Sequence, residues 1–106
     1  MNPEDEIKIW KKHYENEIKP LINEEKYKSA GYEMQTLVLT MKGKEETAVG
    51  NHAGISFIMA AKGLSEELNK EELNIKNIKK YQEFFEAFSA QTNLPTKHSL
   101  EDLENL

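Results

Sequence analysis

The segment from Gly50 to Gly54 contains the residue types of this chain that are best suited to bind a ligand. The sequence Gly50-Asn51-His52-Ala53-Gly54 lies where a β-prone run ends and a helical apolar pattern begins. Backbone N–H groups in the first turn of a helix can bind a phosphate or a carboxylate. The segment matches neither the P-loop nor the dinucleotide-binding pattern, and no Lys follows at the required spacing. The spacing therefore favours a structural turn, with Gly50 turning the chain, Asn51 capping a helix and Gly54 allowing close packing.

Anion binding at this segment is the alternative function. All 14 basic residues are lysines, so the chain lacks the arginines that most often clamp phosphates and carboxylates. Lysine can still compensate an anion as a point charge. The alternative hypothesis is a site for a nucleotide or phosphate, made from Gly50, Asn51, His52 and Gly54 with Lys42, Lys44 and Lys62 nearby.

The remaining polar residues do not form a catalytic or metal-binding pattern. The chain has no cysteine, and His13, His52 and His98 are not spaced as metal ligands. Ser56 follows Gly54-Ile55 but lacks the second glycine of a nucleophile elbow. Adjacent carboxylates such as Glu66-Glu67 point in different directions on a helix and are predicted to be solvated. We therefore expect no catalytic residue, no metal and no cofactor.

Composition predicts one small cytoplasmic domain. The chain has 106 residues, of which 38% are hydrophobic and 31% charged, and it carries a net charge of −5. Residues 65–106 contain nine acids and five lysines, which disfavours binding to nucleic acid or to an anionic membrane. No signal sequence or membrane span is expected from the pattern. Abundant Lys, Glu and Asn without Arg or Cys are typical of accessory proteins of low-GC bacteria and their phages.

The hydrophobic pattern predicts an α+β fold that begins with an amphipathic helix. Pro3 and the acids after it suit a helix start, and one helical face then follows. Pro20 is expected to end or kink this helix near Lys19, and Gly31 to stop the helical region. The residues on the predicted face are Ile7, Trp10, Tyr14, Ile18 and Leu21.

A β-hairpin and two further helices are predicted to complete the domain. Residues 32–41 alternate in a two-residue period, residues 42–46 suit a turn, and residues 47–49 form the returning strand. Helical patterns then run from Asn51 to about Leu68, weakened at Gly63, and from about Glu71 to Ala90. The prediction is a single α+β domain over residues 1–93. Residues 94–106 are predicted to be a C-terminal tail, either a short helix or disordered.

Apolar side chains outside the core suggest protein binding. Leu100, Leu103 and Leu106 repeat beside acidic residues and could dock into a groove of a partner or of the same domain. Trp10 is a second candidate anchor, although a buried position is the ordinary expectation for it. We therefore predict a non-enzymatic regulatory, inhibitory or adaptor protein that binds another protein. We also expect a homodimer or a higher oligomer, because a small domain benefits from burying further surface.

Overall fold

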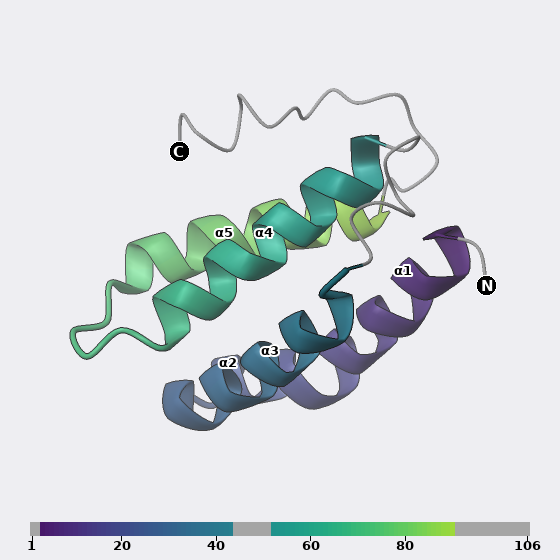
Figure 1. Ribbon diagram of the computed structural model, residues 1–106. Helices are drawn as coiled ribbons and strands as arrows, with labels where there is room; N and C mark the ends of the chain where they lie inside the picture. The colour runs from purple at the N-terminus through teal and green to yellow at the C-terminus, as the bar shows by residue number, and fades with distance from the viewer. Residues whose placement is uncertain (1–2, 44–51, 91–106) are drawn as a thin grey trace.

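The computed structural model describes residues 3–43 and 52–90, and all the regular structure in these ranges is helical. The helix α1 continues through a π-helix, η1, into α2, so these three segments form one long helix (Figure 1). This long helix and α3 form one layer, and α4 and α5 lie against it as a second layer. The segments are α1 (Pro3–His13), η1 (Tyr14–Ile18), α2 (Lys19–Asn23), α3 (Tyr27–Met41), α4 (His52–Leu68) and α5 (Ile75–Ala90).

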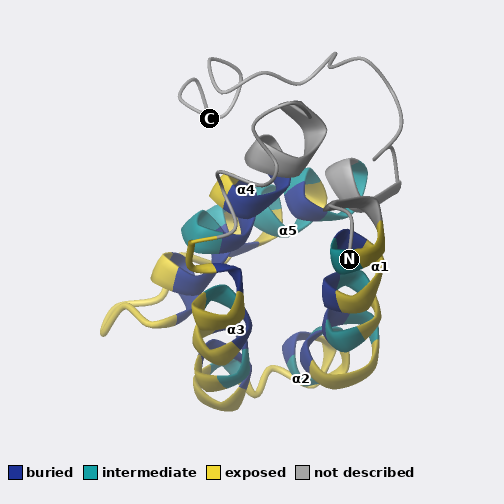
Figure 2. Ribbon diagram, turned by 45° about the vertical axis from the view of Figure 1, so that its right-hand side comes forward, coloured by how far each residue is buried: buried dark blue, intermediate teal, exposed yellow. Residues whose placement is uncertain are grey.

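The buried faces of the helices meet in one hydrophobic core (Figure 2). Four aromatic rings join the two layers: Trp10 stacks on Phe57 at 6.3 Å between centroids, Phe57 contacts Phe85 at 4.3 Å, and Phe85 contacts Tyr14 at 4.7 Å. The predicted apolar face of the N-terminal helix is confirmed, because Ile7, Trp10, Tyr14 and Ile18 are buried and Leu21 is partly buried against the core. These contacts place the long N-terminal helix against both α4 and α5.

The predicted α+β fold is wrong, because residues 32–41 form most of the helix α3. The alternation of Tyr32, Met34, Thr36, Val38 and Thr40 suggested a strand. A second pattern in the same residues has helical spacing: Ala30, Met34, Leu37 and Met41 are all buried. Burial of this stripe against α4 and η1 favours the helix over the β preference of the Leu37-Val38-Leu39 run. Lys42 and Gly43 follow α3, and the predicted turn and returning strand at 44–49 lie outside the described residues.

Gly31 does not end a helix but allows α3 to approach α4 closely. It lies in the second turn of α3, where an added Cβ would be 3.1 Å from the Leu68 carbonyl oxygen and from Asn69 Oδ1. The Asn69 side-chain amide donates to the Gly31 carbonyl at 3.1 Å and to the Ser65 carbonyl at 2.8 Å. A position predicted to stop a helix is therefore a contact between two helices.

Pro20 changes the type of helix and does not end it. Proline has no backbone N–H, and its ring crowds the carbonyl of the fourth residue before it. The chain accommodates this with η1, in which the Lys19 N–H donates to the carbonyl of Tyr14, five residues earlier. The wider π-helical turn gives Pro20 a place near the start of α2, and the helix continues to Asn23.

The connections between helices have recognisable caps. Glu25 has a φ of 60° after α2, and the Lys26 N–H donates to the Leu21 carbonyl at 2.8 Å, which is a Schellman arrangement. Helix α5 starts at Ile75 and not at the predicted Glu71, because Asn74 caps it: Asn74 Oδ1 accepts from the Asn77 N–H at 3.1 Å.

Three further sequence predictions concern α4, membrane spans and the C-terminal tail. Helix α4 runs unbroken from His52 to Leu68, so the weakening predicted at Gly63 does not interrupt the helix. Among the described residues, no helix is both long and apolar enough to cross a membrane. The predicted tail, residues 94–106, lies outside the described residues.

Candidate functional site

A polar cluster joins the two layers beside the aromatic core. The Tyr14 hydroxyl donates to Glu86 Oε2 at 2.7 Å, and the Lys19 ammonium donates to Glu86 Oε1 at 3.0 Å. The wider turn of η1 aligns Tyr14 and Lys19, which are five residues apart, with the same carboxylate on α5. In an ordinary α-helix these two side chains would diverge by about 140°. The π-helix therefore lets two side chains of the N-terminal helix bind one carboxylate of α5.

The electrostatics of the cluster keep both Tyr14 and Lys19 protonated as hydrogen-bond donors to Glu86. Burial removes solvent from the Tyr14 phenol, and this raises its pKa; the hydrogen bond to the Glu86 carboxylate raises it further. The hydrogen bond to Glu86 also raises the pKa of the Lys19 ammonium. Tyr14 thus remains a protonated donor and Lys19 a cation. Since Tyr14 is fully buried, its oxygen is not placed to attack a substrate.

A groove of about 360 Å³ lies next to this cluster, between the α2–α3 connection and α5. Ile22, Tyr27 and Ile78 line its apolar part. Glu83 and Lys79 bring opposite charges to the same groove. A mixed lining of this kind does not select one class of ligand, so we assign no ligand to the groove.

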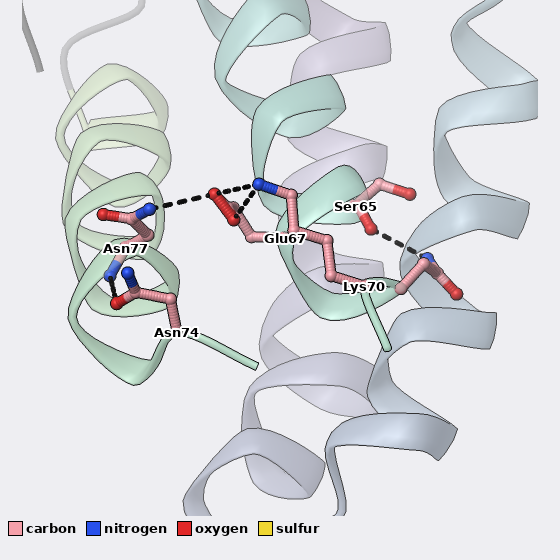
Figure 3. Close-up of polar contacts among 6 residues, drawn as sticks. Ser65, Glu67, Lys70, Asn74 and Asn77 are labelled. Atoms are coloured by element: carbon pink, nitrogen blue, oxygen red, sulfur yellow. Dashed lines mark hydrogen bonds and ion pairs between the residues drawn. The ribbon is translucent and has the colours of Figure 1, made fainter. Parts of the chain in front are cut away.

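A second polar cluster stabilises the end of α4 (Figure 3). Glu67 is only 5% exposed, and its Oε1 accepts from the Lys70 ammonium at 3.0 Å and from the Asn77 side-chain amide at 3.1 Å. Its Oε2 is also 3.0 Å from Lys70 Nζ but has no hydrogen bond of its own. The expectation that Glu67 is solvated is therefore wrong. The carboxylate links α4 to the first turn of α5.

Among the residues whose exposure the structure describes, the outward side of α3 carries the most exposed large apolar side chains. Tyr32 is 70% exposed and Leu39 is 62% exposed, and they are seven residues apart. Together with Lys28, Gln35 and Lys42 they follow steps of four, three, four and three residues, so they lie on one side of the helix. We call these five exposed residues the α3 seam. Such spacing is the one by which helices pair in coiled coils.

The outward side of α3 is also free of exposed acidic residues. Its exposed residues between the two lysines are uncharged: Ser29, Tyr32, Gln35, Thr36, Leu39 and Thr40. Glu33, the one acid in this helix, is half-buried and lies 3.6 Å from His13 Nε2. A continuous neutral surface with two large apolar side chains is suited to contact with another macromolecule. We therefore take the α3 seam as the candidate functional site.

The structure places one predicted interaction residue in the core. Trp10 is 8% exposed and stacks on Phe57 with 12° between the ring planes, so its apolar surface is already occupied. The other three predicted anchors, Leu100, Leu103 and Leu106, lie outside the described residues. Their role stays a prediction.

The predicted anion site is only partly described. His52 and Gly54 belong to the first turn of α4, as the helical pattern predicted, whereas Lys44, Gly50 and Asn51 lie outside the described residues. Lys62 is eight residues beyond Gly54 in the same helix, about 12 Å along its axis. Lys42 belongs to the α3 seam. Anion binding at this segment stays a prediction, but the helix separates Lys62 from the first turn.

The sequence contained a signal for the α3 seam that the two-residue alternation obscured. The 28–32–35–39–42 spacing is visible in the sequence, but it identifies a surface only after residues 27–41 are known to be helical. Within residues 3–43 and 52–90, no group of three or more His, Asp or Glu side chains could hold a metal ion. Comparison of the chain with protein-family models, curated proteins and solved structures found no match.

Proposed function

We propose that the chain is a non-enzymatic binding protein that contacts another protein through the α3 seam. The observation that carries this proposal is the exposure of Tyr32 and Leu39, one heptad apart, on a helix side without exposed acids. Tyrosine offers a large contact area with little loss of side-chain freedom, and an adjacent leucine extends the apolar contact. A regulatory, inhibitory or adaptor role is consistent with such a surface.

The arrangement of the rest of the helix supports this proposal. The opposite side of α3, with Ala30, Met34, Leu37 and Met41, is buried in the core, so the seam is held on a firmly packed element. A rigid helix face loses little conformational entropy when it binds. The seam can therefore act without a change in the fold of the domain.

Site-specific photo-crosslinking in the native host tests the proposal. A photoreactive amino acid would replace Tyr32 in one variant and Lys12, an exposed residue of α1, in a matched control. We expect a defined protein adduct from position 32 and none of the same mass from position 12. The adduct should disappear when Leu39→Ser is added. Equal labelling from both positions would contradict binding at the α3 seam.

A further inference from the structure

The charge of the α3 seam differs from that of the whole chain. The seam contains two lysines, Lys28 and Lys42, and no acid, which gives it a charge of +2. Lys26, just before α3, adds little to this charge because its ammonium lies 3.7 Å from Glu24 Oε2. The whole chain has a charge of −5. Lys28 and Lys42 lie 14 residues apart, at the two ends of the α3 seam, about 21 Å along the helix axis. The apolar contact of the seam is therefore bounded by positive charge at both ends.

This charge pattern disfavours a second copy of the chain as the partner. In an antiparallel pair centred on Gln35, Lys28 of one copy would lie opposite Lys42 of the other. In a parallel pair, each lysine would lie opposite its own equivalent. Both orientations bring like charges together beside the same apolar contact. An occupant with acidic residues at these places would instead pair with both lysines.

A second hollow extends the seam at its N-terminal end. Lys28 also lines a hollow of about 390 Å³ at the connection between α4 and α5, where Leu68 and Leu73 are its apolar lining and Asn69, Lys70 and Glu71 its polar lining. Leu73 is 41% exposed, so the hollow offers apolar surface to solvent. A helix that lies along α3 and continues past Lys28 would bring its next apolar side chain to this hollow.

We propose that the partner surface is an amphipathic α-helix with carboxylates at both ends of its apolar stripe. Its apolar side chains pack on Tyr32 and Leu39, a polar side chain faces Gln35, and its carboxylates pair with Lys28 and Lys42. This inference rests on the proposed binding function and adds the chemistry of the partner. The lysines supply orientation and selectivity, and the two apolar side chains supply most of the contact.

Titration of the full chain with two synthetic helical peptides tests the inference. Both peptides carry leucines one heptad apart; one has glutamates at the flanking positions, and the other has lysines there. We expect the acidic peptide to shift the amide NMR signals of α3 and to bind at least about tenfold more tightly than the basic one. Tyr32→Ser combined with Leu39→Ser should lower the affinity for the acidic peptide by about tenfold or more.

Charge reversal provides a matched control. Lys28→Glu with Lys42→Glu should reverse the preference, so that the basic peptide binds more tightly. Lys12→Glu with Lys76→Glu changes two exposed lysines elsewhere by the same total charge and should leave the preference unchanged. If both double variants change the preference equally, the protein's net charge and not the seam selects the peptide, and the inference is overturned.

Other occupants of the seam give distinct results. A dimer in light scattering that dissociates on Leu39→Ser would make a second copy the occupant. A change in the α3 signals of the full chain on Leu103→Ser would make the chain's own acidic C-terminal segment the occupant. Either result overturns the inference of a separate acidic helix but retains protein contact at the seam. Absence of crosslinks at position 32 would instead remove the proposed function itself.

Discussion

The contact between Gly63 and Tyr81 leads to a quantitative prediction about the α4–α5 interface. An added Cβ at Gly63 would lie 2.2 Å from Tyr81 Cε1 and 2.5 Å from Cδ1. Ordinary carbon contacts are about 3.5–4.0 Å, so the ring must move by more than 1 Å. Overpacking of this kind costs about 1–3 kcal/mol, whereas replacing glycine by alanine in a helix gains up to about 1 kcal/mol. We expect Gly63→Ala to destabilise the protein by about 1 kcal/mol.

The effect of Gly63→Ala on stability should have the opposite sign when the Tyr81 ring is absent. In a Tyr81→Ala background the three atoms nearest to the added methyl group are absent, and Gly63→Ala should stabilise the protein by up to about 1 kcal/mol. The difference between the two backgrounds gives a coupling energy of about 2 kcal/mol, as measured in a double-mutant cycle. Tyr81→Ala alone serves as the reference for the lost ring.

Urea unfolding of the four proteins measures this coupling. Trp10, the single tryptophan, stacks on Phe57 in the core, and its fluorescence should report the loss of the packed state. Circular dichroism follows the helices independently, and equal slopes with urea indicate comparable unfolding transitions. Stabilisation by Gly63→Ala of the same size in both backgrounds would refute the close packing of the ring on this glycine.

Substitutions at three further positions test the caps and the buried cluster. Glu25→Gly should stabilise the protein by about 0.5–1 kcal/mol in urea unfolding, because glycine adopts the positive φ without the cost to a side chain. A loss of stability would contradict this reasoning. Tyr14→Phe should cost about 2 kcal/mol at neutral pH, because a buried hydrogen bond to the Glu86 carboxylate is lost. The raised pKa means that this contribution is present below the tyrosine pKa of the unfolded chain, about 10, and declines as the pH rises above it. Stability curves of the wild type and Tyr14→Phe should therefore converge in alkali, and a constant difference would contradict the role of the phenol. Asn74→Ala should lower the stability by about 1 kcal/mol because the cap of α5 is lost, whereas Asn74→Asp should keep most of the capping stabilisation. Thermal unfolding of both variants measures this difference. Equal losses of stability in the two variants would argue against capping.

The N-terminal helix and α4 could be predicted from sequence because each has one clear period. Ile7, Trp10, Tyr14 and Ile18 fit a single helical face, and their burial follows from that face. The π-helix could not be predicted in the same way. Pro20 indicates a disturbance, but the local pattern does not show whether the helix ends or widens. The contacts that the widened turn makes are distant, because Tyr14 and Lys19 both bind Glu86, which lies more than 60 residues later.

Residues 30–41 show why local pattern alone failed at the most informative helix. The Leu37-Val38-Leu39 run has a high β preference, and the alternating positions beside it fit a strand. The decisive contacts are distant: Gly31 meets Leu68 and Asn69 from the end of α4.

Because residues 30–41 form a helix and not a strand, neighbouring apolar residues in this segment lie on different sides of it. Leu37 becomes a core residue, whereas Leu39 becomes an exposed one on the side that carries Tyr32. In a strand, Leu37 and Leu39 would share one face; in the helix they lie about 160° apart. The period of the element therefore decides which leucine stabilises the fold and which is available to a partner. The candidate site could not be predicted until that period was known.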